Sequence, residues 1–171
     1  GISIVHDQNQ TMSMFLYNPY TSFSLHSVVD TDGQAGAELV VVRYGVGLYA
    51  SENGVSVIND RLNGKMQYYY DPNVSYSIYA IADTDGQPGA EIVVDRHATS
   101  LYAYENGISI IDDRERVKRL YWLEVNPGFS INRVANYDGI AGAEVCYNVN
   151  NPLRYWMIID RTQNRAVRSG C

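Results

Sequence analysis

The chain has 171 residues, 46% of them apolar, and a formal net charge of −6. This length and composition predict a single domain with one sizeable core. The acidic balance argues against a nucleic-acid partner, because phosphate backbones are bound by basic surfaces. No apolar stretch approaches the about 20 residues that cross a bilayer, so we expect no membrane insertion.

An acidic nine-residue segment recurs along the chain. It begins at Asp30 and returns at Asp83 and, weakened, at Asn136, each time after 53 residues. A fixed period of this length is typical of one supersecondary unit copied in tandem. We therefore predict one repeat domain over residues 1–171, with repeats at approximately 1–53, 54–106 and 107–171.

Other segments recur with the same period. Residues 54–61 and 107–114 share a pattern that starts with glycine and ends with Asp-Arg, and residues 1–7 match the first seven positions of both. The sequence is therefore expected to begin inside a repeat. Residues 155–161 resemble this strand again but arrive early. The third copy is therefore expected to carry a deletion between Cys146 and Leu153.

Each repeat has the signals of β-strands and turns. In the second repeat, residues 77–83 and 100–104 alternate apolar and polar side chains, and 90–94 form an apolar run, so each segment predicts a strand. Asn53-Gly54 and Asn106-Gly107 favour type I′ hairpin turns, and Asn63-Gly64 marks another turn. The prolines follow aromatic strands, which must end there: Pro19, Pro72 and Pro127.

These elements predict an all-β protein with four-stranded antiparallel repeats of the size of propeller blades. Three blades do not close a ring, so the fold is expected to be incomplete as a monomer. The alternative is a β-trefoil with threefold symmetry. Open sheet edges invite pairing with other chains, and we therefore expect a homo-oligomer or a larger assembly.

The acidic segment has the residue spacing of a calcium loop. Oxygen-bearing side chains occupy its first, third, fifth and ninth positions, and calcium prefers six to eight oxygen ligands from such alternating positions. The candidate ligands are Asp30, Asp32, Gln34 and Glu38 in the first copy, and Asp83, Asp85, Gln87 and Glu91 in the second. Asn136 and Ile140 replace two of these ligands in the third copy.

These loops and the apolar strands that follow them resemble the FG-GAP repeats of integrin-type β-propellers. The family loop reads Asp-x-Asp-x-Asp-Gly-x-x-Asp before a strand such as Leu-Val-Val. Asp30, Asp32 and Glu38 match it before residues 39–42, and Asp83, Asp85 and Glu91 match it before 92–94. The resemblance implies blades, calcium as a structural ion, an extracellular or cell-surface location, and binding roles more often than catalysis.

The loop also departs from the family pattern. Gln stands where the family has its third Asp, the glycine comes two positions early, and Glu replaces the last Asp. The alternative to a calcium site is a tight turn in which the first Asp accepts backbone N–H bonds and no ion is bound.

No nucleophile elbow, phosphate loop, dinucleotide fingerprint or paired-histidine zinc motif is present in the sequence. We therefore expect no catalytic residues and no enzymatic activity; a fragment of a carbohydrate-active enzyme is the weaker alternative. Asp-Arg pairs recur at Asp60, Asp113 and Asp160 and predict a turn-stabilising salt bridge. Alternatively, each Arg and a neighbouring Tyr or Trp122 grip a sugar.

The function predicted from these patterns is a non-enzymatic, secreted adhesion module that binds a carbohydrate, like a lectin, or a protein. The alternative is a structural subunit of a self-assembling surface oligomer or filament. The two cysteines, Cys146 and Cys171, are either joined in a disulfide or are two free thiols.

Overall fold

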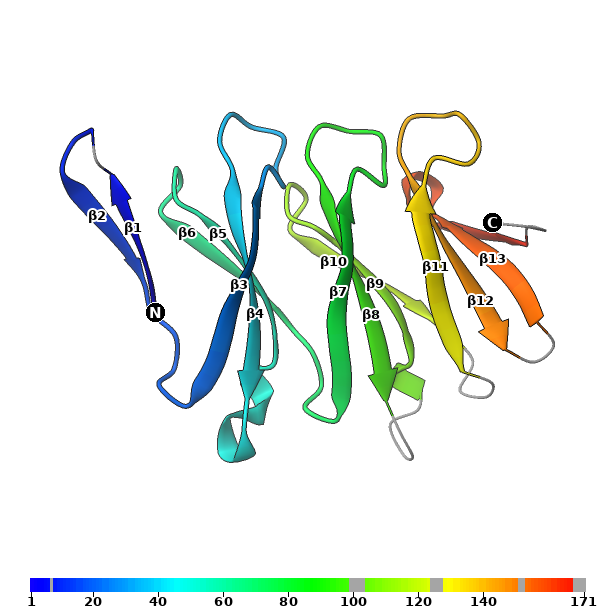
Figure 1. Cartoon of the computed structure of the whole chain (residues 1–171), viewed down its shortest axis with the longest axis horizontal. Coiled ribbons are helices and arrows are strands. Elements are labelled where there is room, and N and C mark those ends of the chain that lie inside the picture. Colours follow the sequence, from blue (N-terminus) through cyan, green and yellow to red (C-terminus); the bar gives the residue numbers. More distant parts are fainter. Residues whose placement is uncertain (7, 99–103, 124–127, 151–152, 168–171) are drawn as a thin grey trace. The chain divides into compact units, whose positions relative to one another are not determined.

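The structure is a computed structural model that describes residues 1–6, 8–98, 104–123, 128–150 and 153–167. Its strands form one two-stranded and three four-stranded sheets, all antiparallel (Figure 1). The strands of the first unit are β1 (Ile2–His6), β2 (Thr11–Phe15), β3 (Thr21–Val29), β4 (Glu38–Gly45), β5 (Gly54–Asn59) and β6 (Gly64–Tyr69). Those of the second are β7 (Val74–Ala82), β8 (Glu91–Ala98), β9 (Gly107–Asp112), β10 (Val117–Trp122), β11 (Phe129–Ala135), β12 (Glu144–Asn150), β13 (Leu153–Ile159) and β14 (Asn164–Val167).

The chain divides into two compact units. The first contains Gly1–Asp30 and Ala35–Pro72, and the second contains Thr31–Gln34 and Asn73–Cys171. The prediction of an all-β chain with four-stranded antiparallel repeats is confirmed. Among the described residues no strand of one sheet is hydrogen-bonded to a strand of another, and they form neither a closed propeller nor the shared barrel of a trefoil.

Each four-stranded sheet is a meander, because consecutive strands are neighbours in the order β3-β4-β5-β6, and the same order holds for β7–β10 and β11–β14. The two central strands carry most of the buried side chains. All six residues of β5 and of β9 are buried. A strand that is covered on both faces reads as a nearly continuous apolar run, which is the pattern the sequence shows there.

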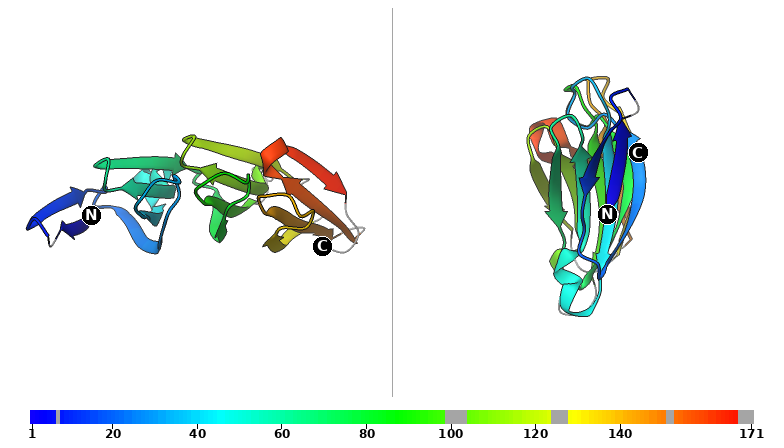
Figure 2. Two further views of the ribbon diagram at one scale, coloured as in Figure 1. Left: turned by 90° about the horizontal axis from the view of Figure 1, so that it is seen from above. Right: turned by 90° about the vertical axis from the view of Figure 1, so that its left-hand side faces the viewer.

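The second unit is built from two sheets that pack face to face (Figure 2). One face of β7–β10 contributes Val93, Ile108, Ile110, Tyr121 and Leu123 to a shared core. The facing side of β11–β14 contributes Phe129, Ile131, Val145, Tyr147 and Ile158. In the first unit a smaller core joins Phe15 of the two-stranded sheet to Val41 and Ile58.

The first strand of every four-stranded sheet carries a β-bulge at the same place in the repeat. The registers shift between Leu25 and Ser27, between Ile78 and Ala80, and between Ile131 and Arg133. In the second unit the bulge residue Tyr79 donates its hydroxyl to the backbone oxygen of Asn132, 2.9 Å away. A bulge can re-aim a side chain, and here it links two neighbouring sheets.

One local prediction is wrong. Residues 47–52 form the short 3₁₀ helix η1 (Gly47–Glu52), so Asn53-Gly54 is not a type I′ hairpin turn, and the Asn53 side chain instead accepts the Gly45 backbone N–H at 2.8 Å. Residues 100–103 of the strand predicted at 100–104 lie outside the described residues. The Asn63-Gly64 turn is confirmed, with Asn63 in the left-handed region at φ 47°.

The third repeat is shortened as predicted. β12 ends at Asn150 and β13 begins at Leu153, whereas η1 and its flanking residues separate β4 from β5. Cys146 in β12 is fully buried and disulfide-bonded. Its predicted partner, Cys171, lies outside the described residues.

Candidate functional site

The second acidic loop, residues 83–91, connects β7 to β8 and is organised by its own carboxylates. The Asp83 carboxylate accepts the Gly86 N–H at 2.6 Å, and the Asp85 carboxylate accepts the Gln87 N–H at 2.9 Å. Glu91, at the start of β8, accepts the Thr84 N–H at 2.6 Å and the Thr84 hydroxyl at 3.0 Å. These are the bonds of the tight-turn alternative, in which aspartates bind the backbone two or three residues ahead.

The acidic loops of the second unit stack on one another through their glycines. Gly86 has a φ of 79°, and a Cβ atom there would lie 2.6 Å from the backbone oxygen of Ala141 in the third acidic loop, residues 136–144. The Ala143 N–H donates to the Asp83 backbone oxygen at 2.7 Å. Only glycine combines this dihedral angle with so close a neighbour, so the motif glycine is required by loop stacking.

A hydroxyl–carboxylate contact joins each stacked loop to the next sheet along the chain. Thr84 donates its hydroxyl to Asp160 at 3.1 Å, and Thr31 donates to Asp113 at 3.5 Å. Asp160 and Asp113 are the aspartates of the recurring Asp-Arg pairs. Thr84 and Thr31 hold the second position of the acidic loop, which is Tyr137 in the third copy.

Asp160 is the centre of a buried polar network between the two sheets of the second unit. It is 2% exposed and accepts the Tyr121 hydroxyl at 2.6 Å and Arg119 at 3.1 Å, in addition to Thr84. Burial raises the pKa of its carboxyl, while the bonds from Tyr121, Arg119 and Thr84 oppose that rise. Such a buried carboxylate is stable only while its partners remain in place.

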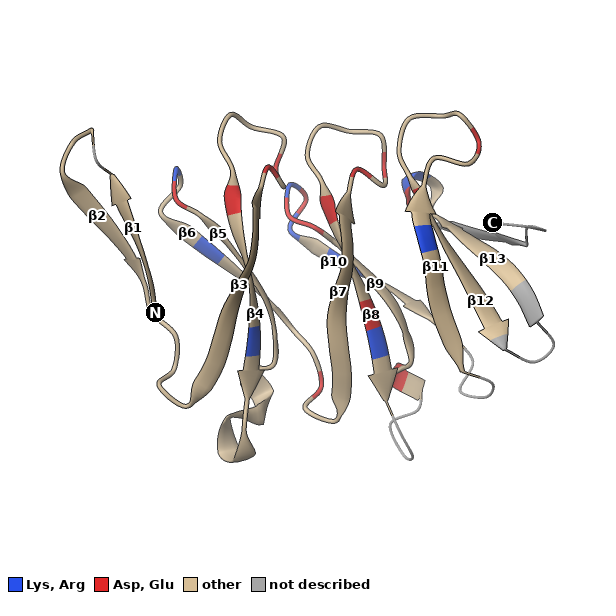
Figure 3. Ribbon diagram, in the orientation of Figure 1, with Lys and Arg blue, Asp and Glu red and all other residues tan. Residues whose placement is uncertain are grey.

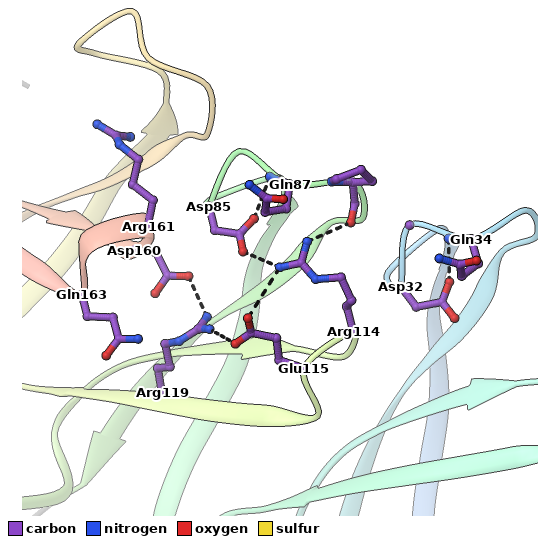
Figure 4. Close-up of a pocket in the computed structure, with 12 residues that line it drawn as sticks. Asp32, Gln34, Asp85, Gln87, Arg114, Glu115, Arg119, Asp160, Arg161 and Gln163 are labelled. Atoms are coloured by element: carbon purple, nitrogen blue, oxygen red, sulfur yellow. Dashed lines mark hydrogen bonds and ion pairs between the residues drawn. The ribbon is translucent and has the colours of Figure 1, made fainter.

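Two arginines of the Asp-Arg pairs turn back to the acidic loops. Arg114 forms an ion pair with Asp85 at 2.6 Å and lies 3.4 Å from the Pro88 backbone oxygen (Figure 4). Arg161 pairs with Asp138 and Glu144 of the third loop. At these two positions the structure confirms the predicted turn-stabilising salt bridge. Trp122, the aromatic residue considered as an arginine partner for sugar, lies instead 4.8 Å from Arg96.

The structure brings together two of the predicted sets of metal-binding carboxylates. Oxygens of Asp83, Asp85 and Glu91 lie within 4.8 Å of one another, as do those of Asp30, Asp32 and Glu38. These two groups can hold a metal ion, and no other such group is found among the described residues. These groups contain only carboxylates, and the ligand role predicted for Gln34 and Gln87 stays a prediction. The backbone N–H groups of Gln34 and Gln87 bind Asp32 and Asp85.

The second carboxylate group is already partly neutralised by the protein. Asp85 shares one oxygen with Arg114, and Glu91 is 1% exposed. Burial raises the pKa of Glu91 to about 7, and the charges of Asp85 and Asp112 add to the rise, although the bonds from Thr84 oppose it. A cation at this group would have to share Asp85 with the guanidinium.

A polar pocket of about 630 Å³ lies beside these loops, entirely within the second unit. Charged segments gather at this loop-bearing end of the sheets (Figure 3). The pocket is lined by Asp32, Gly33, Gln34, Asp85, Gln87, Pro88, Arg114, Glu115, Arg119, Asp160, Arg161 and Gln163. Figure 4 shows Arg114 between Asp85 and Glu115, and Arg119 between Glu115 and Asp160.

Three glutamine side chains in the pocket keep their amides available. Gln34, Gln87 and Gln163 make no side-chain hydrogen bond to any residue that the structure describes. Gln34 and Gln87 hold the fifth position of their acidic loops, where the sequence predicted metal ligands. The pocket lining thus includes the equivalent glutamine of two acidic loops.

Sequence reasoning missed several residues of this site. The repeated Thr31 and Thr84 were a visible signal, since both hold the same position of an otherwise acidic motif. Arg119 gave no signal, because Met66 occupies its place in the preceding repeat. Its role depends on the contact between two sheets, which the local pattern does not contain.

No family model, curated protein or solved structure matches this chain. The repeated four-stranded sheets are therefore established by the structure alone, and FG-GAP membership remains a prediction. Among the described residues, no helix is long and apolar enough to span a membrane.

Proposed function

We propose that the protein is a non-enzymatic, extracellular binding module built from FG-GAP-like repeats, and that its pocket binds a carbohydrate. The observation that carries this proposal is the lining of the pocket. Sugar hydroxyls both donate and accept hydrogen bonds, and the lining offers carboxylate acceptors, guanidinium donors and the three available glutamine amides. A protein ligand is the alternative.

The carboxylates of the pocket favour binding over catalysis. Asp85 is paired with Arg114, and Arg119 is paired with both Glu115 and Asp160. A glycosidase needs one carboxyl that delivers a proton and a second that attacks or activates water. Carboxylates held by arginine as acceptors are poorly suited to either role, which supports a module without hydrolytic activity.

An extracellular location is supported by the disulfide at Cys146. Structural disulfides persist in oxidising compartments and are rare in the cytosol. The location implied by the FG-GAP resemblance is the same. Fractionation of the producing cells tests this part of the proposal. We expect the protein in the extracellular or cell-surface fraction, and its recovery in the cytosol would contradict the proposal.

A glycan array tests the binding proposal directly. Gln87→Ala should abolish the signal of any glycan that the protein binds, because it removes an amide from the pocket wall. Ile140→Ala is the matched control, since Ile140 holds the same position of the third loop and does not line the pocket. An array without hits, or equal losses in both variants, would contradict the proposal; release of product from reporter glycosides would favour the enzyme alternative.

Calcium is the second part of this proposal, at the Asp83, Asp85 and Glu91 group. Because Arg114 holds Asp85, Arg114→Gln should raise calcium affinity several-fold in isothermal titration calorimetry. Arg161→Gln serves as the control, since Arg161 pairs with the third loop and Asn136 has replaced a ligand there. If neither protein binds calcium, and if a chelator leaves the melting temperature unchanged, the ion has no place in this module.

The alternative function, a subunit of a self-assembling surface structure, is supported by the outer strands of the four-stranded sheets. Among the described residues β3 and β6 each have a strand on one side only, and such edges invite pairing with other chains. Light scattering tests it, because a monodisperse monomer at high concentration would exclude self-assembly.

A further inference from the structure

The turn that joins β1 to β2 contains the sequence pattern of an N-linked glycosylation site (Figure 1). Asn9-Gln10-Thr11 reads Asn-x-Ser/Thr, a pattern in which the asparagine amide receives an oligosaccharide and the third residue supplies a hydroxyl. Proline is excluded from the middle position, and Gln10 meets this condition. The pattern occurs once more in the sequence, at Asn73-Val74-Ser75.

The threonine of the first motif folds back onto the asparagine side chain. The Thr11 hydroxyl donates to the Oδ1 atom of Asn9 at 2.6 Å, and the Thr11 backbone N–H donates to the same oxygen at 3.2 Å. Such a bond from an asparagine to the backbone two residues ahead is typical of a turn. Both contacts use the oxygen and leave the amide nitrogen, the atom that receives the sugar, outside them.

This turn is open to solvent and recurs in the other repeats with different side chains. All three residues of the motif are exposed. Gln10 has a φ of 55°, and its counterparts Asn63 and Arg116 have φ angles of 47° and 57°. Leu62 and Glu115 stand where this turn has its asparagine, and both are exposed. A position that holds such different side chains in solvent has room for a bulky group.

The second motif lies in a different setting. Val74, its middle residue, is 4% exposed and begins β7. Ser75 lies opposite His97 of β8, and its hydroxyl donates to the His97 backbone oxygen at 3.0 Å. The sheet therefore engages the hydroxyl of this motif, which makes it a comparison for the first motif within the same chain.

We propose that Asn9 is a site of N-linked glycosylation and that Asn73 is occupied far less. In the transfer, the Asn9 amide nitrogen bonds to the anomeric carbon of an oligosaccharide carried on a lipid diphosphate. The bond from that carbon to the diphosphate oxygen breaks, the diphosphate leaves with the electron pair, and the nitrogen loses one proton. The proposal rests on the extracellular location proposed above, because this transfer takes place on exported proteins.

The full chain, exported by a host that glycosylates secreted proteins, provides the test. A glycan-releasing amidase converts each occupied asparagine to aspartate, and peptide mass spectrometry then locates the converted positions. We expect conversion at Asn9 and several-fold lower conversion at Asn73. An unmodified Asn9, or equal conversion at the two positions, would overturn the proposal.

Two substitutions of Thr11 test the hydroxyl by itself. Thr11→Val keeps the branched shape of the side chain and removes the hydroxyl, so the glycan at Asn9 should be lost, whereas Thr11→Ser should retain it. Ser75→Ala is the matched control and should leave the glycan at Asn9 unchanged. Circular dichroism verifies that each variant keeps the β-fold. A glycan that persists in the valine variant would contradict the assignment.

The rate of glycan release is a measurement on the wild-type protein alone. Because Asn9 lies in an exposed turn, the amidase should remove its glycan from the native protein about as readily as from the isolated peptide. Release from the peptide alone would contradict the exposed position on which the proposal depends.

Failure of the glycosylation site and failure of the extracellular location have different readouts. Asn9 belongs to the first unit, and the pocket that carries the proposed function belongs to the second. Secreted protein with an unmodified Asn9 would overturn the glycosylation site and leave the proposed function intact. Recovery of the natural protein from the cytosol in the fractionation experiment would overturn the location and, with it, the modification in the producing cell.

Discussion

The second and third acidic loops have nearly the same local structure although their candidate ligands differ. The first residue accepts the N–H of the glycine at 2.6 Å when it is Asp83 and at 2.7 Å when it is Asn136. The final glutamates accept the second residue's N–H at 2.6 Å and 2.7 Å. The loop shape therefore requires an oxygen acceptor at its first position and does not require a negative charge there.

The two loops differ in what surrounds them. A Cβ atom on Gly86 would meet the third loop, whereas one on Gly139 would meet no atom within 4 Å. The Oγ1 hydroxyl of Thr84 donates to the buried Asp160. Tyr137 holds the same position of the third loop and has no hydroxyl on its β-carbon. The sequence of the second loop thus serves two tasks, its own turn and its packing against a neighbour, while the third loop retains the first task.

The largest effect is expected from the carboxylate that the second loop binds. Asp160→Ala should cost about 3–5 kcal/mol in the free energy of unfolding, because Tyr121, Thr84 and Arg119 all lose the buried acceptor that they share. Asp138→Ala, which removes the exposed partner of Arg161, should cost about 0–1 kcal/mol. Urea denaturation measures both values, and similar losses would show that the buried network has no special weight.

The pH dependence of stability should depend on Glu91. Its pKa rises from 4.5 to about 7 on folding, so its contribution to stability is complete below about pH 4.5 and is lost as the pH rises through about 7. The loss is at most about 3 kcal/mol. Melting temperatures measured between pH 5 and pH 8 should therefore fall in the wild type and fall less in Glu91→Gln. Parallel curves would exclude Glu91 as the cause.

A pair of glycine substitutions isolates the stacking of the loops. Gly86 and Gly139 have φ angles of 79° and 78°, so alanine suffers the same backbone strain at both positions. Gly86→Ala also forces an atom against Ala141, which should add about 1–3 kcal/mol to its cost. Equal costs in urea denaturation would mean that the loops separate without penalty.

The smallest of these effects concerns the threonine hydroxyl. Thr84→Val should lower the free energy of unfolding by about 1–2 kcal/mol, because Asp160 and Glu91 each lose a donor. Thr84→Ser keeps the hydroxyl and should restore most of that stability. If the serine variant is as unstable as the valine variant, the methyl packing of Thr84 is the relevant interaction.

The carboxylates of the candidate metal groups were found from the sequence because they are local. Asp83, Asp85 and Glu91 lie within nine residues, and a tight turn brings them together whatever the rest of the chain does. The predicted role of Gln87 as a further ligand stays a prediction, because spacing does not reveal to which side of a loop a side chain points. In the structure this residue lines the pocket.

A salt bridge of Arg114 with a turn was also predicted, because the Asp-Arg pair recurs at the end of one strand. In the structure Arg114 pairs with the acidic loop of its own sheet, β7–β10. The network of Arg119, Tyr121 and Asp160 was not. Its members come from two sheets. Tyr121 and Asp160 have counterparts in Tyr68 and Asp113, but Met66 stands in the place of Arg119, and periodicity does not show which residues of two sheets meet.

The sequence by itself determined the repeat, the all-β class, the deletion in the third copy and the acidic turns, because each depends on short-range patterns that a single repeat contains. The tertiary structure alone decided that the motif glycines and threonines serve the contact between neighbouring sheets. These properties arise only when one sheet meets another, because burial, close approach and strand pairing depend on neighbours that are distant in the chain.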